Sequence, residues 1–418
     1  MQTMSRSLVA LFACSSGLSV ANVYYAQPLL DALAVDFSIS RAAVGGVITA
    51  TQLGSVLALL LLVPLGDLVQ RRRLMLGQLL ALVAALAAVG AAASATALMI
   101  GMLAVGMLGT AMTQGLIAYA ATASAASERG RVVGAAQGGV VAGLLLARVL
   151  AGLIADLAGW RSVYQSSALA MLAMALLLWR VLPAQAAAPT LSYPRLIGSM
   201  FTLLRRERVL QVRGVIALLM FAAFSILWSA LVLPLSAPPY NYSHAAVGAF
   251  GLVGFAGTLA AARAGSWADR GWAQYTSAGA LLLMLLAWWP LAWGVSSLAA
   301  LIAGILMLDL AVQALQVTNQ SMIFRGHAGS HSRLVGCYMM FYAVGSGSGA
   351  LAATSVYDVA GWSGVCWLGA AVSLAALVFW VLTLEQRPSS AGRPPGLSAW
   401  CRSAARCRPR SCGRCPST

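Results

Sequence analysis

The sequence predicts an all-α membrane protein with twelve transmembrane helices, arranged as two six-helix halves related by pseudo-symmetry. Three observations predict this fold: the composition, twelve apolar stretches of spanning length, and an internal repeat. Of the 418 residues, 61% are hydrophobic and only 9% are charged, and the mean hydropathy is +0.85. A soluble domain of this size could not bury so much apolar surface, so the expected solvent is lipid.

Twelve stretches of about 20 apolar residues, the length that crosses the hydrocarbon as a helix, follow one another along the chain. They lie near residues 7–30, 43–63, 74–93, 97–122, 132–155, 162–182, 212–236, 244–266, 274–294, 298–320, 334–356 and 361–384. The first stretch has one basic flanking residue and runs directly into the second. We therefore interpret it as a retained helix and not as a signal peptide.

The arginines predict how these helices are oriented. All 26 basic residues are arginine. They crowd the N-terminus and the loops on one side, whereas the opposite loops hold only Arg41 and Arg161. By the positive-inside rule both termini are expected in the cytoplasm, in a plasma membrane of the bacterial inner-membrane type. This distribution explains the net charge of +16 without nucleic acid as a partner.

Three short motifs recur at one offset of 202 residues. The pairs are Asp67 with Asp269, Arg131 with Arg333, and DLAGW at 156–160 with DVAGW at 358–362. A duplicated six-helix unit in a membrane protein indicates a transporter with its substrate path between the halves. The expected parts are an N-terminal bundle at 1–182, a cytoplasmic linker at 183–211, a C-terminal bundle at 212–384, and a disordered basic cytoplasmic tail at 385–418.

These features resemble the major facilitator superfamily over about residues 7–384. Its signature loop after the second helix reads Gly-x-x-x-Asp-Arg/Lys-x-Gly-Arg/Lys-Arg/Lys. The residues that match are Asp67, Arg71 and Arg72 in the first copy, and Gly265, Asp269, Arg270 and Gly271, at a different spacing, in the second; Val63, Leu68 and Gln70 depart from the pattern. The stretches NVYYAQPLL (22–30), SERGR (127–131) and LAGWR (157–161) resemble the twelve-helix drug:proton antiporter and small-solute efflux branch.

The resemblance implies that the signature loops form a gate. An acidic residue at a helix end can pair with arginines across the cytoplasmic mouth in one state and lose that contact in the other. The expected gating residues are Asp67, Arg71, Arg72, Asp269 and Arg270. The alternative is that these charges only fix the topology.

Asp309 is the only acidic residue deep inside a predicted span. The eight residues before it are apolar or glycine, and at about 1.5 Å per residue it lies roughly 16 Å from the outer end of the tenth span. An ionised aspartate facing lipid there would cost about 2.5–3.5 kcal/mol or more. We therefore expect Asp309 to face protein or a water-filled path.

Polar residues continue the face of Asp309 along the tenth span and form similar stripes in the first, fourth and seventh spans. In the resembled family these four helices line the central cavity. The candidate lining residues are Asn22, Thr110, Gln114, Ser229, Gln313 and Gln316. Polar stripes also occur at helix–helix contacts, so packing is the alternative reading.

Arg148 is a second charge at similar depth, about 12 Å inward from Asp156. Its repeat counterpart is Ala350, so the arginine breaks the duplication. The hypothesis is that Arg148 either pairs with Asp309 across the halves or binds an anionic substrate group. Making and breaking the pair would move Asp309 between its ionised and protonated forms, which would couple transport to protons. A static ion pair, or an arginine that snorkels outward, is the alternative.

The predicted function is secondary active transport by alternating access, with proton-coupled efflux of a small organic compound as the leading form. The antiporter branch places an arginine in the fourth span near Gly106 or Met107, where this chain has none. Uptake and uncoupled facilitated transport therefore stay open.

A membrane-embedded enzyme or a sensor is the rival class. An enzyme would need paired carboxylates, a metal cluster or a nucleophile with its base inside the bilayer. The chain has no HExxH and no GxSxG, and its three histidines fall in loops or flanks. We expect no enzymatic activity, no cofactor and no metal. The expected partners are a small-molecule substrate, protons and the lipid bilayer, and the protein is expected to work as a monomer.

Overall fold

The computed structural model describes residues 5–66, 68–124, 128–182, 192–238, 240–254, 272–294, 296–324 and 331–385. Within these ranges the chain is helical and contains no strand. Residues Met1–Trp380 form one compact unit, and Val381–Thr418 form a second.

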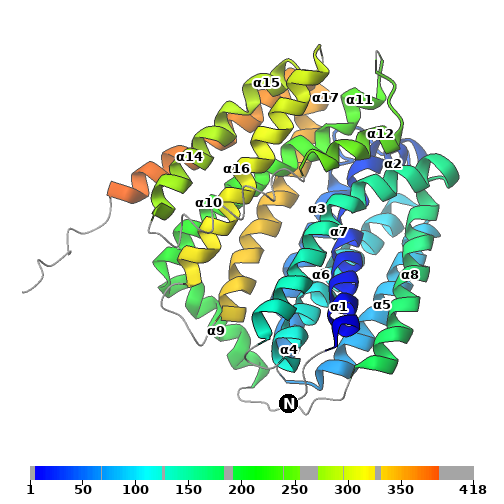
Figure 1. Cartoon of the computed structure of the whole chain (residues 1–418). Coiled ribbons are helices and arrows are strands. Elements are labelled where there is room, and N and C mark those ends of the chain that lie inside the picture. The colour runs from blue at the N-terminus through cyan, green and yellow to red at the C-terminus, as the bar shows by residue number, and fades with distance from the viewer. Residues whose placement is uncertain are drawn as a thin grey trace, which may run out of the picture. The chain divides into compact units, whose positions relative to one another are not determined.

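The described residues of the first half form eight α-helices and two short helical turns of other types. These elements are α1 (Arg6–Tyr24), η1 (Gln27–Leu29), α2 (Leu30–Asp36), α3 (Gly46–Leu57), η2 (Ala58–Leu62), α4 (Val63–Leu65), α5 (Arg71–Gly90), α6 (Ala95–Ala123), α7 (Arg129–Ala158) and α8 (Trp160–Val181). Helix α1 packs against α6 and α7, and α5 packs against α6 and α8. These helices form the blue-to-teal group in Figure 1.

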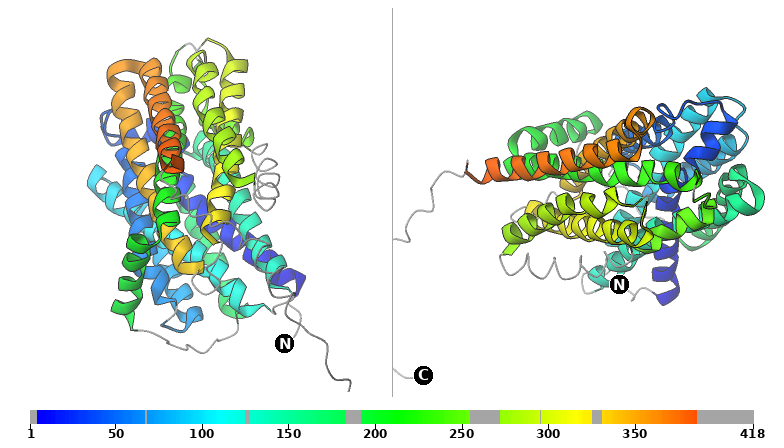
Figure 2. Two further views of the ribbon diagram at one scale, coloured as in Figure 1. Left: turned by 90° about the vertical axis from the view of Figure 1, so that its left-hand side faces the viewer. Right: turned by 90° about the horizontal axis from the view of Figure 1, so that it is seen from above.

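The second half begins with a short helix on the linker and then adds the remaining spans. Its elements are α9 (Tyr193–Arg206), α10 (Arg208–Ala230), α11 (Val232–Ser236), α12 (His244–Ala249), η3 (Phe250–Leu252), α14 (Ala273–Leu286), α15 (Trp288–Ala292), α16 (Leu298–Phe324) and α17 (His331–Glu385). Helix α16 packs against α10, α14 and α15. Figure 2 shows the green, yellow and orange helices of this half grouped together.

Ten helices among the described residues are long and apolar enough to span a membrane. The longest, α17, contains two predicted spans, because Gly361 interrupts it with a non-helical φ of 61°. The predicted span at 244–266 is described only to Gly254, where α12 and η3 form its beginning. The described helices are therefore consistent with twelve spans.

The repeat seen in the sequence is also visible in the backbone. Among the described residues, the two glycines with positive φ, Gly159 (82°) and Gly361 (61°), lie 202 residues apart, and each turns the chain between consecutive spans. The same offset relates two glycines that let helices touch. A Cβ on Gly143 would lie 2.2 Å from a carbonyl oxygen of α1, and one on Gly345 would lie 2.1 Å from a carbonyl oxygen of α10. The fifth and eleventh spans thus approach the first helix of their own halves in the same way.

The two halves meet mainly at one end of the bundle. We call this the arginine-poor end; it contains the loops at 37–45, 91–94, 237–243 and 293–297, and it lies at the top of Figure 1, with α2, α11, α12 and α15. Here α7 packs against α12, and a Cβ on Gly152 would lie 2.2 Å from the carbonyl oxygen of His244. Thr354 of α17 accepts a hydrogen bond from the backbone N–H of Gly45, at 3.2 Å.

Helix α9 connects the halves near the opposite end. Its residues Leu196 and Met200 are buried. Ser199 accepts a hydrogen bond from Arg333 of α17 at 3.0 Å, and the hydroxyl of Tyr193 donates to the carbonyl of Leu61 at 2.8 Å. The linker therefore contains a helix whose apolar face partly packs on the protein itself.

Candidate functional site

Arg148 is buried in the middle of the bundle. It projects from α7, is 2% exposed, and its Nε donates a hydrogen bond of 2.7 Å to the Oε1 of Gln27 in η1. Its Nη2 is also buried and has no hydrogen-bond partner among the described residues. A guanidinium held in this way is fixed at one edge and has a free donor at the other.

Aromatic rings from both halves surround this guanidinium. Its Cζ lies 3.9 Å from the ring centroid of Trp228 and 5.6 Å from that of Phe224, both on α10. The ring of Tyr24 on α1 lies 5.8 Å away. Cation–π attraction is worth about 2 kcal/mol or more at a desolvated site. These rings therefore offset part of the cost of burying the charge.

Asp309 lies next to the same tryptophan. It is 5% exposed on α16, and the Nε1 of Trp228 donates to its Oδ1 at 3.4 Å. A Cβ on Gly254 would lie 2.4 Å from its Oδ2. Asp309 is thus buried against protein, and its role in a substrate or proton path remains a prediction. No ion pair within 4.0 Å joins Arg148 and Asp309 in the described part of the chain, so Trp228 contacts both charges while they remain apart.

Two tyrosines complete the boundary between the halves at this depth. The hydroxyl of Tyr24 on α1 is in hydrogen-bond contact with that of Tyr342 on α17. The ring of Tyr342 packs edge-on against Phe221 of α10, with centroids 4.2 Å apart. Arg148, Asp309, Trp228 and these tyrosines together form what we call the central cluster.

The other predicted lining residues do not all join this cluster. Asn22 is fully buried and accepts a 2.6 Å hydrogen bond from Ser167 of α8. Thr110 donates to Ser55 at 2.8 Å, and Ser229 is within 3.4 Å of Ser225 on its own helix. These three side chains use their polar groups in packing within one half, which is the alternative that a polar stripe always allows.

The glutamines have mixed positions. Gln316 accepts a hydrogen bond from the hydroxyl of Tyr338, and Gln313 is half-buried on the same helix. Gln114 lines a separate small pocket between α4, α5 and α6, with a cavity volume of about 70 Å³. Arg71 and Gln78 line the same pocket.

Only part of the predicted gate falls on described residues. Asp67, Asp269 and Arg270 lie outside them. Arg71 donates to the carbonyls of Gly66 and Ala118, at 2.9 and 3.0 Å. Arg72 donates to the carbonyl of Trp179 in α8. Both arginines thus bind neighbouring helix ends within the first half, and their role in a gate remains a prediction.

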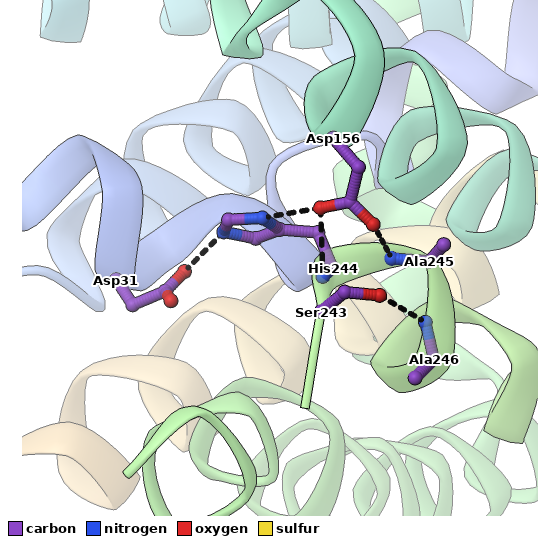
Figure 3. A network of polar contacts seen from close by, with 6 residues as sticks. All are labelled: Asp31, Asp156, Ser243, His244, Ala245 and Ala246. Carbon is purple, nitrogen blue, oxygen red and sulfur yellow. Dashed lines mark hydrogen bonds and ion pairs between the residues drawn. The ribbon is translucent and has the colours of Figure 1, made fainter. Parts of the chain in front are cut away.

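A second charged cluster joins the halves at the arginine-poor end (Figure 3). His244, the first residue of α12, places its Nε2 3.1 Å from Asp31 of α2 and its Nδ1 3.0 Å from Asp156 of α7. Asp156 also accepts from the backbone N–H groups of His244 and Ala245, at 3.0 and 2.8 Å. We call Asp31, Asp156 and His244 the latch. Its histidine comes from the second half and its carboxylates from the first.

The latch was not among the sequence-predicted site residues, since a histidine flanking a span is ordinary. Its partners lie 88 and 213 residues away, and no local pattern indicates such a contact.

Sequence reasoning also missed Arg213. This residue of α10 is 3% exposed and donates to Ser277 and Asn319 at 2.8 and 3.2 Å. Within the described ranges no group of three His, Cys, Asp or Glu side chains is arranged to hold a metal ion.

Comparison with known proteins shows what this arrangement resembles. The family model described as Major Facilitator Superfamily matches residues 10–330. The chain is 42% identical over 384 residues to the "Uncharacterized transporter YgaY" of Escherichia coli O157:H7, covering 90% of this chain and 95% of the relative. It is 32% identical over 394 residues to the "Probable transporter SCO4007" of Streptomyces coelicolor, covering 92% and 88%.

Solved structures share the fold at low sequence identity. The crystal structure of the nucleoside transporter NupG matches with a TM-score of 0.74 at 14% identity, covering 90% of this chain and 98% of that one. The human organic anion transporter MFSD10 (TETRAN) matches with a TM-score of 0.66 at 20% identity, covering 91% and 100%.

Proposed function

The chain belongs to the Major Facilitator Superfamily of membrane transporters, and from that membership we propose that it exports a small organic compound in exchange for protons by alternating access. Uptake or uncoupled facilitated transport on the same fold is the alternative. The single observation that supports the proposal best is the central cluster. It places one buried cation and one buried carboxylate at the boundary of the two halves, without pairing them.

The separation of these charges supports proton coupling. A buried ionised carboxylate with no cation in contact is costly, and protonation removes that cost. If Arg148 approaches Asp309 in another state, the pair would favour the ionised form. One conformational cycle would then bind and release one proton at Asp309.

The unpartnered Nη2 of Arg148 supports a hydrogen-bond acceptor on the substrate. A buried donor without a partner costs about 1–3 kcal/mol, and an anionic or carbonyl oxygen on a substrate would remove this cost. The surrounding rings of Trp228, Phe224 and Tyr24 would suit a planar or apolar body. Nucleosides and organic anions, the compounds named for two structural relatives, are therefore the first to screen.

The contacts between the halves support an inward-facing state. They concentrate at the arginine-poor end, which the positive-inside rule assigns to the extracytoplasmic side. In this proposal the latch and the α7–α12 contact close the outer mouth, and both termini face the cytoplasm.

Asp309→Asn tests the proposal. Asparagine keeps the size and accepts from Trp228 but cannot exchange a proton, so we expect transport driven by a pH gradient to fall at least tenfold. The substrate would first be identified from nucleosides, organic anions, sugars and cationic dyes by its increase in the melting temperature of purified protein. Flux would then be measured in liposomes with an imposed pH gradient.

Asp36→Asn is the matched control, because Asp36 is a surface carboxylate paired with Arg161 inside the first half. Unchanged proton-driven flux in Asp309→Asn would exclude Asp309 as the proton carrier. Flux that falls equally in both variants would show a general defect.

A further inference from the structure

The hydrogen-bond geometry of the latch requires His244 to be protonated. Both ring nitrogens of His244 lie within hydrogen-bond distance of a carboxylate oxygen, at 3.1 Å from Asp31 and 3.0 Å from Asp156. An ionised carboxylate only accepts hydrogen bonds, so both nitrogens must donate. Neutral imidazole has one N–H, and the protonated ring has two. The contacts are thus fully satisfied only when His244 carries a positive charge.

The latch is also a contact between the two halves. Asp31 and Asp156 belong to α2 and α7 of the first half, and His244 opens α12 of the second (Figure 3). Breaking the contact would leave two carboxylates facing each other without their shared cation. The protonated latch therefore stabilises the state in which the arginine-poor end is closed.

We propose that His244 is a proton sensor on the outer face of this transporter: when it is protonated it clamps the two halves together there, and its deprotonation releases them. The sensor rests on the alternating-access function proposed above. The sensor is distinct from the proton carrier proposed at Asp309. A proton that binds to His244 is released to the same side of the membrane, so it is not transported.

In the described part of the chain, Asp31 and Asp156 are the charged groups in contact with His244. The elements that pack against α12 are α7, α11, η1 and η3. Among them α7 contributes Asp156, and α11, η1 and η3 have no titratable side chain. Helix α2 contributes Asp31 and, at its far end, Asp36, which pairs with Arg161. Tyr240 and Tyr242 lie in the loop before α12, and Arg148 lies two turns further along α7.

The environment of the ring supports the direction of the switch. The hydrogen bond to Asp31, helped by Asp156 and opposed by partial burial, raises the pKa of His244 from 6.5 to about 9. In the open state the ring would return toward its ordinary value. The latch thus contributes its full stability below pH 6.5 and loses it as the pH rises through about 9. Between these values the ratio of closed to open molecules falls by up to about tenfold per pH unit.

The distance between the two halves at the outer mouth tests the sensor directly. Ala93→Cys and Ser296→Cys, exposed positions in loops of the first and second half, would receive spin labels in full-length protein without its native cysteines. The distance distribution would be measured in nanodiscs from pH 6 to pH 9.5. We expect a short distance to dominate at low pH and a longer one to grow as the pH rises.

Three variants identify the responsible group. His244→Gln should remove the pH response and favour the long distance. Asp31→Asn should shift the midpoint to lower pH, because it removes the largest contribution to the raised pKa. Asp36→Asn, the surface control, should behave like the parent.

Each failure has its own meaning. A pH response that persists in His244→Gln, or is absent in the parent while two distances are still seen, overturns the sensor and leaves alternating access intact. Equal shifts in Asp31→Asn and Asp36→Asn also overturn it. A single distance under every condition, including saturating substrate, overturns both proposals.

Discussion

At the scale of single residues, Trp228 is the side chain that contacts both buried charged residues, Arg148 and Asp309. Its ring centroid lies 3.9 Å from the guanidinium carbon of Arg148, and its N–H donates to Asp309. Stacking on a ring needs a flat cation, and the contact to Gln27 needs a donor in the plane of that cation. Arginine supplies both at once, and lysine cannot.

Arg148→Lys is therefore expected to keep the positive charge but to bind the transported compound less tightly. We predict at least a tenfold loss of affinity for the transported compound, measured by its shift of the melting temperature across a concentration series. Arg195→Lys, an exposed position on α9, is the control and should bind like the parent. Equal affinity in Arg148→Lys would mean that a positive charge alone suffices at this position.

The sequence predicts these residues unequally. Asp309 and Arg148 stand out because a charge inside a long apolar stretch is costly and rare. Asn22 and Thr110 look equally suitable from periodicity, yet the structure turns their polar groups into contacts within the first half. A helical period identifies a face, but it cannot tell whether that face meets water or another helix.

At the scale of elements, α7 is the helix that belongs to both interfaces. Gly143 lets it approach α1 within its own half, and Gly152 lets it approach α12 across the halves. Gly138 on the same helix has nothing within 4 Å of an added Cβ. The same helix thus contains a glycine at the contact between the halves (Gly152), a glycine at a contact within one half (Gly143) and a glycine without a close neighbour (Gly138).

Gly152→Ala should disfavour the contact between the halves at the arginine-poor end. The new methyl group would lie 2.2 Å from the backbone carbonyl oxygen of His244, and overpacking of this kind typically costs about 1–3 kcal/mol. Because the clash exists only while the halves touch, we expect the open state to gain, seen as a longer distance between labels at positions 93 and 296 at pH 7.

Gly138→Ala is the matched control for this change and should leave the distance unaltered. A drop in melting temperature without any change in distance would instead show that Gly152 serves folding and not the conformational equilibrium.

At the scale of the whole molecule, the arginine distribution and the repeat both predict that the termini lie on one side. The sequence predicts the spans well because each must be apolar over its whole length. It cannot predict at which end of the bundle the two halves touch, since the same apolar helices would form the bundle in either case. That information lies in contacts such as Thr354 with Gly45 and His244 with Asp31, which join residues 309 and 213 positions apart.

The orientation can be checked by labelling intact cells. In protein without native cysteines, Ser296→Cys should react with a membrane-impermeant maleimide, and Thr202→Cys on α9 should react only after the cells are opened. Both positions are exposed. Reaction of Thr202→Cys in intact cells, with Ser296→Cys protected, would reverse the topology and move the latch to the cytoplasmic side.

The paired turns at Gly159 and Gly361 each connect two helices at the arginine-poor end with almost no intervening chain. Each reverses the chain through one left-handed residue, so neither hairpin offers a protruding loop. These two hairpins therefore expose little chain to a binding protein such as an antibody. A reporter tag inserted into either hairpin would separate two helices that pack as neighbours. Such insertions are therefore better placed elsewhere in the chain.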